Sequence, residues 1–587
     1  MTPHKNSSYC TQEKIPFIYM PEALSKTCNQ CSETFTITAQ EQDFFQKIAP
    51  TFGDERFDIP LPTSCPRCRR KRRHAFRNER NLYQRKCDLC LKDIVSIYHE
   101  KKTFPVYCPD CWWSDKWDPM SYGRNFDFSR TFFEQFAELF HEVPKLALIK
   151  ANDENSEYNN SVGGLKNCYL TFDGGMSQDC YYGQTFDTIR DCVDFLSLQD
   201  SELCYECNDC KNCYHLFYSQ FSQNCRDSYF LRDCIGCKNC FGCTNLRQKE
   251  YCIFNEQFSK EEYEKRIAAF DLASFANLKK VTDQVRKFWQ SQSYPAVRGI
   301  GNENSTGNNI NHCSNAILCF NCKDLQDCGY CTIVIVNGKD CYDLDKWGRD
   351  TELVYNSASS GDGAHNIIAG YYCAFGASNM CHSAYCWQNC HDLFGCVGFH
   401  NKNSFSILNK QYSKEEYMKL VPQIIRHMQK TNEWTQFFPP SLSAFGYNES
   451  VAQEEFPLTK EEALAQNWQR DDYVAPDPPH SDVLEQASLP DRIKDVDESI
   501  LKKALRCESS GKLYRIVAPE LAFYRRFDIP LPRRHPDIRH LDRRVLSTVQ
   551  QLFESTCSKC GTALQTVYPS SEKKLVYCAK HYEEAVA

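Results

Sequence analysis

Cysteine follows a strict period of three in the first half of the chain. Between residues 168 and 252, every cysteine occupies a position whose number is divisible by three. The same phase from 162 to 246 holds only Val, Leu, Cys, Thr, Gly, Ser, Phe and Ile, and carries no charge. An α-helix repeats every 3.6 residues and a strand every two, so neither gives this pattern. A narrow β-solenoid does, because short strands joined by tight corners point every third side chain toward the axis. We predict a β-solenoid over residues 156–258.

The triplets that end in cysteine indicate the length of one coil. KNC, QDC, RDC and related triplets end at 168, 180, 192, 204, 213, 225 and 234, which predicts coils of 12 or 9 residues. The pattern resembles, in geometry only, the 12-residue right-handed solenoid of beetle antifreeze proteins. A second solenoid is predicted over 300–410. One phase runs through it from 310 to 334 and another from 381 to 399, so insertions are expected around 338–380. The second phase consists of Cys381, Ala384, Trp387, Cys390, Leu393, Cys396 and Phe399.

The choice of cysteine leaves three interpretations open. Free cysteine is a small buried hydrophobe that suits a thin coil. Cysteines on adjacent coils would lie about 4.8 Å apart, so disulfides could form in an oxidising compartment. The runs at 204–213 and 234–243 could instead hold an iron–sulfur cluster. Their last spacing is short, however, and Tyr214 or Thr244 follows instead of the proline of ferredoxins. We favour a reduced core without metal.

Two nested duplications organise the 587 residues. RFDIPLP occurs at 56–62 and again at 526–532, so the two ends are copies of one module. NEQFSKEEY at 255–263 returns as NKQYSKEEY at 409–417, and each copy contains a capping box that predicts a following helix. Ser259 with Glu262 begins one helix, and Ser413 with Glu416 begins the other. The segment 433–500, with FFPP and APDPPH, is predicted to be an extended, partly disordered linker.

Paired CxxC motifs predict zinc sites at both ends. Zinc takes four thiolate or imidazole ligands in a tetrahedron, and each CxxC turn supplies two of them. Sequential pairing is favoured over a cross-brace. In the C-terminal copy the positions of Cys65 and Cys68 hold His535 and Ile538, and the partner motif has decayed to Cys507 and Ser510, while the other four ligands survive. We predict about three structural zinc ions. The ligand sets are Cys28, Cys31, Cys65 and Cys68; Cys87, Cys90, Cys108 and Cys111; and Cys557, Cys560, Cys578 and His581.

The N-terminal set also carries a family resemblance. CNQCSETFTITAQEQDFF followed by PTSCPRCRRKRR resembles the probable zinc-ribbon or treble-clef domain of bacterial proteins, although Ser32 and Glu33 stand where that family usually has glycine. Through FPLTKEEALAQNW and CWWSDKWD, the whole chain resembles large cysteine-rich zinc-ribbon proteins of bacteria with reduced genomes. Some of those are labelled CaiB/BaiF CoA-transferases, but no repeating βαβ pattern or identifiable catalytic Asp supports that label. The resemblance implies zinc modules and no particular activity. The matching residues are Cys28, Cys31, Phe35, Thr38, Glu41, Gln42, Phe44, Cys65, Cys68 and Arg69.

These features predict a multidomain, mainly β fold. Zinc-ribbon or treble-clef modules at both ends flank two narrow cysteine-rich β-solenoids, and a helical segment follows each solenoid. The predicted boundaries are a tail at 1–27, a zinc ribbon or treble clef with a basic helix at 28–86, a second ribbon at 87–126, a helical connector at 127–155, the first solenoid at 156–258, a helical segment at 259–299, the second solenoid at 300–410, a helix at 411–432, the linker at 433–500, a degenerate zinc module at 501–545 and a C-terminal ribbon at 546–587.

The stretch after the first zinc ligands is strongly basic. A zinc knuckle followed by an arginine-rich helix is typical of proteins that bind a phosphate backbone. Alternatively, the helix pairs with the acidic remainder of the same chain, whose net charge is −7. The candidate nucleic-acid-binding residues are Arg67, Arg69, Arg70, Lys71, Arg72, Arg73, Arg77, Arg80, Arg539 and Arg543.

We expect a non-enzymatic scaffold or adaptor that binds nucleic acid, RNA in preference to DNA, or a ribonucleoprotein. The sequence contains no Gly-rich phosphate loop, GxSxG or HExxH motif. The alternatives are an iron–sulfur redox protein and a protein–protein scaffold without nucleic acid. The N-terminus lacks an apolar signal region, and no run of about 18 apolar residues occurs. We therefore expect a cytoplasmic protein without membrane partners, whose thiols are reduced or bound to zinc.

Overall fold

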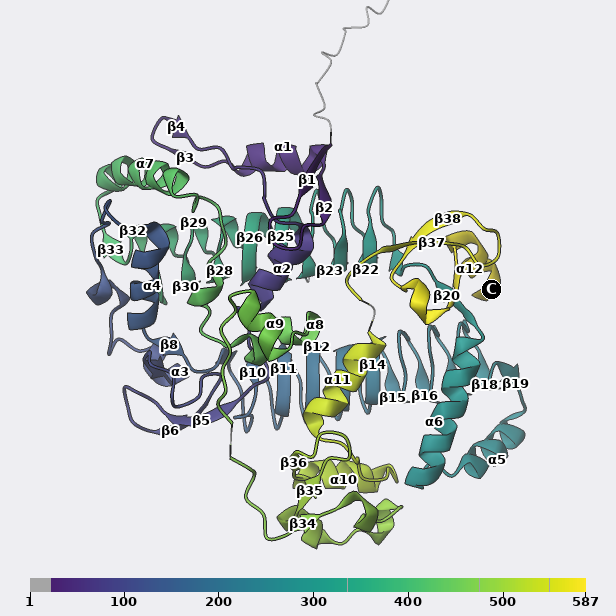
Figure 1. Ribbon diagram of the computed structural model, residues 1–587. Helices are drawn as coiled ribbons and strands as arrows, with labels where there is room; N and C mark the ends of the chain where they lie inside the picture. The colour runs from purple at the N-terminus through teal and green to yellow at the C-terminus, as the bar shows by residue number, and fades with distance from the viewer. Residues whose placement is uncertain (1–22, 335, 475, 548, 587) are drawn as a thin grey trace, which may run out of the picture.

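The computed structural model describes residues 23–334, 336–474, 476–547 and 549–586, so most of the predicted tail lies outside the described residues. The chain is a multidomain α/β protein with two long, mostly parallel sheets. In Figure 1 the second sheet lies above the first, and the modules at the two chain ends pack against both. We call these the first sheet (β9 to β19) and the second sheet (β21 to β33).

The first sheet is a stack of coils that repeat every twelve positions. Strands pair in parallel with their counterparts on the next coil, so Tyr181 pairs with Val193, and Val193 with Tyr205. Isolated bridges repeat this spacing elsewhere on the coil, as between Glu202 and Tyr214. The prediction of shorter, nine-residue coils is wrong, because the triplets ending at 213 and 234 lie at other corners of the same longer coil. The strands are β9 (Lys150–Ala151), β10 (Asn160–Gly163), β11 (Tyr169–Gly175), β12 (Tyr181–Asp187), β13 (Val193–Gln199), β14 (Tyr205–Lys211), β15 (Tyr214–Phe217), β16 (Arg226–Tyr229), β17 (Lys238–Phe241), β18 (Glu250–Ile253) and β19 (Glu256–Gln257).

The second sheet changes its coil length along the chain. Phe320 pairs with Thr332, a step of twelve positions, whereas Thr332 pairs with Asp345, a step of thirteen. The sequence predicts insertions from the change of phase in this region; the change arises instead from the longer coil. Cys390, Leu393, Cys396 and Phe399 face the interior of the second sheet, but Cys381, Ala384 and Trp387 belong to the core that packs against the N-terminal module, so their predicted inward phase is wrong. The strands are β21 (Gly299–Ile300), β22 (Gly307–Asn311), β23 (Cys319–Lys323), β24 (Thr332–Val334), β25 (Gly338–Gly348), β26 (Thr351–Gly361), β27 (His365–Ile368), β28 (Tyr371–Cys373), β29 (Ser378–Cys381), β30 (Ala384–Cys386), β31 (His391–Phe394), β32 (Ser404–Ile407) and β33 (Lys410–Gln411).

A left-handed backbone conformation precedes the inward positions. At Asn167, Asp179 and Asp191 the φ angles are 53°, 53° and 50°. Asn and Asp tolerate this region better than other residues with a side chain, because their short polar groups bond locally. This explains why Asn or Asp so often comes directly before an inward cysteine.

Small polar side chains satisfy the backbone inside the coils. The backbone N–H of Cys213 donates to Ser201 Oγ on the preceding coil at 3.0 Å, and the Cys207 thiol donates to the carbonyl oxygen of Leu216 at 3.1 Å. Buried polar groups need such partners. Serine and cysteine are small enough to fit the interior and polar enough to bond the neighbouring coil.

The helices that follow each sheet begin where the capping motifs predict. The Ser259 hydroxyl accepts from the backbone N–H of Glu262, and a complete capping box joins Ser413 and Glu416. The segment predicted as an extended linker is instead packed over much of its length, because Trp434, Phe437 and Phe438 are buried. The elements are α5 (Lys260–Phe270), α6 (Phe275–Gln290), β20 (Ser293–Pro295), α7 (Lys414–Lys430), α8 (Val451–Glu455), α9 (Lys460–Ala465) and β34 (Val483–Leu484).

Each end module has two parts. We call them the N-terminal clef (24–77), the N-terminal hairpin (83–112), the C-terminal clef copy (504–546) and the C-terminal hairpin (553–582). The N-terminal elements are β1 (Leu24–Thr27), β2 (Thr34–Ile37), α1 (Ala39–Ile48), β3 (Thr51–Phe52), β4 (Glu55–Arg56), α2 (Pro66–His74), β5 (Tyr83–Lys86), β6 (Asp93–Ser96), β7 (Val106–Tyr107) and α3 (Pro109–Trp112), with α4 (Phe132–Glu142) and β8 (Lys145–Leu146) leading to the first sheet. The C-terminal elements are β35 (Ala504–Arg506), β36 (Leu513–Tyr514), α10 (Ala518–Arg526), α11 (Pro536–Leu546), β37 (Phe553–Thr556), β38 (Ala563–Thr566), β39 (Leu575–Tyr577) and α12 (Ala579–Val586).

Candidate metal centres

Among the described residues, the same tight turn occurs four times in the end modules. In each, the N–H of the first residue bonds the carbonyl of the residue five positions on, and the N–H of the fifth residue bonds back to the first carbonyl. At Cys28 these bonds measure 2.9 and 3.0 Å, and at Cys557 they measure 2.9 and 2.8 Å. The fifth residue is left-handed, with φ of 62° at Ser32 and 73° at Gly561. The turns starting at Cys87 and Cys507 have the same two bonds.

Three of the four turns bring a complete ligand set together. In each predicted set, the four ligand atoms lie within 4.8 Å of one another. Cys31 Sγ lies 3.7 Å from Cys65 Sγ, and Cys90 Sγ lies 3.9 Å from Cys108 Sγ. Zinc–sulfur bonds of about 2.3 Å in a tetrahedron require sulfur separations of about 3.8 Å. The three groups could therefore hold structural zinc, and they pair sequentially as predicted.

One hydrogen bond to sulfur is shared by all three sets. The N–H of the first residue in the second motif donates to the first cysteine of the set. Cys65 donates to Cys28 Sγ at 3.2 Å, Cys108 to Cys87 Sγ at 3.3 Å, and Cys578 to Cys557 Sγ at 3.3 Å. Such bonds stabilise a thiolate, which is the form that binds zinc.

The C-terminal set differs in ligand type and exposure. His581 Nδ1 lies 3.3 Å from Cys578 Sγ and 3.6 Å from Cys557 Sγ, so imidazole takes the place of the fourth thiolate. Cys31 and Cys560 are both exposed, but three ligands of each N-terminal set are buried, whereas in the C-terminal set only Cys557 is. A metal held in the C-terminal hairpin is therefore the easiest for solvent and chelators to reach.

The C-terminal clef copy has kept the turn without the ligands. Cys507 remains, while Ser510, His535 and Ile538 stand at the other three ligand positions. His535 now begins helix α11, where its Nδ1 accepts from the N–H of Asp537 at 3.1 Å. The backbone turn is therefore present here without the complete set of four ligands.

Comparisons with known proteins bear on the N-terminal clef alone. Residues 25–77 match the family described as a probable treble clef domain. No match is found among the curated proteins. One solved structure similar to the chain is described as a "putative acetyltransferase from Desulfovibrio desulfuricans G20". The match has 10% identity and a TM-score of 0.10, and it covers 41% of this chain and 64% of that chain, less than two thirds of the latter's length. A TM-score this low carries no argument about fold or activity.

The arginines of helix α2 are bound by carboxylates of the second sheet. Arg69 Nε donates to Asp343 at 2.7 Å. Arg73 is fully buried; it bonds Asp343 at 3.1 Å and also pairs with Asp345. Burial raises the pKa of Glu41 to about 7, even though the adjacent Arg69 lowers it. Buried charges of this kind are stable only when paired.

Helix α11 repeats this arrangement on the first sheet. Arg539 pairs with Asp194 and lies 3.4 Å from Glu520, and Arg543 lies 3.0 Å from Asp194 and 3.2 Å from Glu206. Both arginines are buried. They occupy the positions of Arg69 and Arg73 at the 470-residue offset.

The two interfaces correspond residue by residue. Ile-Thr-Ala-Gln-Glu at 37–41 aligns with Ile-Val-Ala-Pro-Glu at 516–520, so Glu41 corresponds to Glu520. Each of these glutamates accepts from a tyrosine of the sheet, Tyr330 at 3.2 Å and Tyr182 at 2.8 Å. The 470-residue offset aligns the arginines but not the glutamates, which are matched only by this second short alignment. The correspondence of Glu41 and Glu520 is therefore not evident from the offset.

The docking is crossed with respect to chain order. The N-terminal clef packs on the second sheet, and the C-terminal clef copy packs on the first (Figure 1). The hairpins pair with strands that precede the other sheet in the chain, although the N-terminal hairpin also contacts the second sheet, where Tyr98 Oη lies 3.0 Å from Tyr385 Oη. β7 pairs in parallel with β8 just before the first sheet, and β39 pairs in parallel with β20 just before the second. Each end module therefore bridges both sheets.

The remaining basic candidates are bound to different extents. Arg77 pairs with Glu79 at 2.6 Å, and both are buried. Arg70 and Arg80 lie at longer distance, 3.9 Å each, from Glu455 and Asp537. Five basic positions between residues 67 and 80 retain some exposure: Arg67 is exposed, while Arg70, Lys71, Arg72 and Arg80 are partly buried.

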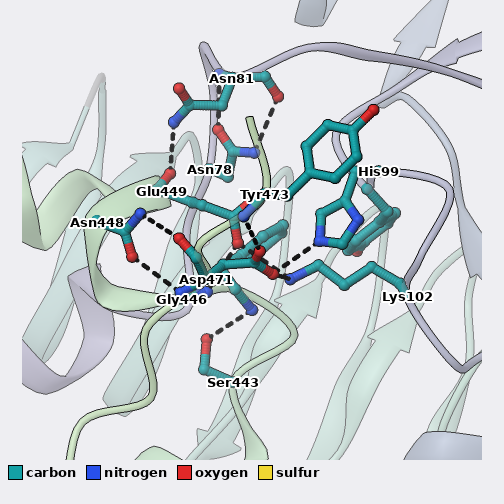
Figure 2. A network of polar contacts seen from close by, with 12 residues as sticks. Asn78, Asn81, His99, Lys102, Ser443, Gly446, Asn448, Glu449, Asp471 and Tyr473 are labelled. Carbon is teal, nitrogen blue, oxygen red and sulfur yellow. Dashed lines mark hydrogen bonds and ion pairs between the residues drawn. The ribbon is translucent and has the colours of Figure 1, made fainter. Parts of the chain in front are cut away.

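A further cluster of possible ligands joins His99 of the N-terminal hairpin to Glu449, which precedes α8, and to Asp471, which follows α9 (Figure 2). His99 Nε2 lies 2.7 Å from Asp471, and Lys102 Nζ lies 3.0 Å from Glu449 and 2.6 Å from Asp471. The ammonium group already occupies the place between the carboxylates that a metal would need. Tyr473 stacks on the His99 ring at 4.4 Å. The cluster therefore works as a polar clamp between segments.

The described part of the chain contains no helix long and apolar enough to cross a membrane.

Proposed function

We propose that this chain is a non-enzymatic cytoplasmic scaffold for protein partners, built on two cysteine-lined β-solenoids and stabilised by about three zinc ions. The observation that carries the proposal is the crossed docking of the end modules. Arg69, Arg73, Arg539 and Arg543 are used inside the molecule, where they hold the modules on the solenoids. A rigid body of this kind presents long walls of exposed side chains, which suits assembly better than catalysis.

The interior of the solenoids supports this proposal over iron–sulfur chemistry. Among the described residues, no solenoid cysteine belongs to a group of three or more ligands lying mutually within 4.8 Å. The thiols of Cys213 and Cys396 donate to the backbone carbonyl oxygens of Lys211 and Ser406, each at 3.2 Å. A cluster ligand must be a thiolate, which cannot donate such a bond. A packed, reduced core accounts for the cysteines.

Nucleic-acid binding, with RNA favoured, is a second candidate function. The observation in its favour is the part of the basic stretch in which Arg67 is exposed and Lys71 and Arg72 are half-buried. Three cations can contact a phosphate backbone, but they support weak and strongly salt-dependent binding. In this proposal the buried arginines position the helix and do not touch the ligand.

One affinity purification separates these functions. The full chain is tagged, purified anaerobically in low and in high salt, and examined for zinc, for iron–sulfur colour in the visible spectrum and for the ultraviolet absorbance of nucleic acid. The scaffold proposal expects zinc, no colour, and protein partners that survive both high salt and nuclease. Material released by nuclease or salt, and absent when Arg67, Lys71 and Arg72 are changed to Gln, would support the second candidate. A coloured protein containing iron would contradict both.

A further inference from the structure

A cleft of about 480 Å³ lies where the C-terminal clef copy meets the first coils of the first sheet. Tyr169 and Tyr181 supply aromatic surface, and Val517 and Pro519 form part of the lining at the start of α10. Glu157 and Asp179 supply carboxylates. Cavities of this size typically hold small organic ligands.

The equivalent place in the other half of the molecule is bridged by a side chain. There, Gln40 Nε2 donates to the carbonyl oxygen of Asn315 at 2.7 Å, joining α1 to the second sheet. Pro519 stands at the position of Gln40, and Asn167 stands at the position of Asn315. Proline has no side-chain amide to make this bond, so the gap stays open in the C-terminal half.

The walls of the two places also differ. An asparagine-to-aspartate hydrogen bond between adjacent coils identifies the equivalent positions in the two sheets. Asn167 Nδ2 donates to Asp179 at 2.9 Å, and Asn315 Nδ2 donates to Asp327 at 2.8 Å. When Asn167 is aligned with Asn315, Tyr169 and Tyr181 correspond to Ile317 and Gly329. The half of the molecule without the complete set of zinc ligands thus has no glutamine at the bridging position and has two aromatic rings in the lining.

The charge of the lining selects the kind of ligand. No Lys, Arg or His is among the described residues that line the cleft, and two carboxylates are. Within the described part of the chain, Glu157 has no hydrogen bond or ion pair. Aromatic faces and carboxylates together attract organic cations, and the described lining offers an anion no cationic side chain. We propose that this cleft binds a small organic cation of the quaternary ammonium or polyamine class.

Saturation-transfer-difference NMR on the full-length protein tests this. The probes are choline, tetramethylammonium and spermidine, with 3,3-dimethyl-1-butanol as the uncharged analogue of choline. We expect transfer to the cations, with dissociation constants of about 1 mM for such small ligands, and little transfer to the alcohol. Tyr181→Leu and Glu157→Gln should each weaken choline binding about tenfold.

Pro519→Gln gives the sharpest variant, because it restores the residue that bridges the gap in the other half. It should abolish choline binding while leaving the zinc content and the melting temperature close to those of the wild type. Gln40→Ala is the matched control and should leave choline binding unchanged. Equal binding of choline and its uncharged analogue would overturn the proposal, and so would unaltered binding by Pro519→Gln. No transfer to any of the three cations at about 10 mM, tenfold above the expected constant, would overturn it as well.

Discussion

Arg539 and Asp194 stand 345 residues apart in the sequence and form a buried ion pair between α11 and β13. Arg69 and Asp343 form the corresponding pair between α2 and β25. In both copies of the interface, arginines of a basic stretch hold an end module on a sheet, so they stabilise the folded chain.

Removing one buried guanidinium should destabilise the protein strongly. Arg73→Met leaves Asp345 with His74 as its remaining basic neighbour and Asp343 with Arg69 alone, and breaking such a buried pair typically costs about 3–5 kcal/mol. The shift in the midpoint of urea unfolding, followed by tryptophan fluorescence, measures the effect. Arg67→Met, at an exposed position of the same helix, is the control and should change the free energy by less than about 0.5 kcal/mol. Equal shifts for the two variants would contradict the docking role of Arg73.

Zinc should leave the protein in two phases. The purified chain is expected to contain about three zinc ions, in line with its three complete ligand sets. Because only Cys557 of the C-terminal set is buried, whereas three ligands of each N-terminal set are, a chelator with a colour change should remove about one ion quickly and the rest slowly. Cys560→Ser should eliminate the fast phase, whereas Cys507→Ser should change neither phase. Loss of zinc from the second variant would mean that the C-terminal clef copy still binds metal.

The interior of the first sheet should tolerate smaller residues better than larger ones. Cys192 is fully buried, and its thiol lies 3.1 Å from the carbonyl oxygen of Arg190 and 3.8 Å from that of Ser201 on the next coil. Cys192→Ala removes one sulfur and should cost about 1 kcal/mol, while Cys192→Leu overfills the coil and should cost about 1–3 kcal/mol. Thermal melting compares the two variants with the wild type. A stabilising leucine would show that the coil has unfilled space.

One buried histidine should give the protein a measurable pH dependence. Burial lowers the pKa of His382 to about 3, and its ring packs against Phe132 at 5.3 Å and Trp434 at 6.0 Å. Between pH 3 and 6.5 the unfolded chain binds a proton at this position and the folded chain does not, so stability rises with pH across that window by about 1.4 kcal/mol per unit. The stabilisation is complete above the ordinary pKa of histidine.

The variant His382→Gln isolates this contribution. Its unfolding free energy should change less steeply between about pH 4 and 6 than that of the wild type, while the two curves run parallel above about pH 7. Urea unfolding at a series of pH values gives both slopes. Identical slopes would show that the imidazole is protonated inside the folded protein.

The local features could be predicted from the sequence because each depends on residues that are close together in the chain. The period of three, the CxxC turns and the capping boxes at Ser259 and Ser413 are set by residues within a coil or a turn. The lengthening of the coil in the second sheet was missed, because one extra position per turn looks like an irregular insertion when phases are read linearly.

The docking of the modules was not accessible in the same way. The basic character of Arg69 and Arg73 was evident, but their partners Asp343 and Asp345 lie far downstream and carry no local signal. Crossed pairing depends on surface complementarity between distant elements. The sequence therefore left nucleic acid and the chain's own acids as open alternatives for the same arginines.

Because the docking is crossed, the first sheet cannot gain its docked module until the C-terminal clef copy has been synthesised. At elongation rates of about 5–20 residues per second, the 345 residues between Asp194 and Arg539 take roughly 17–70 s to make. Throughout that time the first sheet has Tyr182, Asp194 and Glu206 without their partners, whereas the second sheet meets an N-terminal clef that already exists. A chain released early by the ribosome would have the N-terminal clef docked on its second sheet and no module docked on its first sheet. Docking of the C-terminal clef copy and hairpin is therefore the last step of assembly.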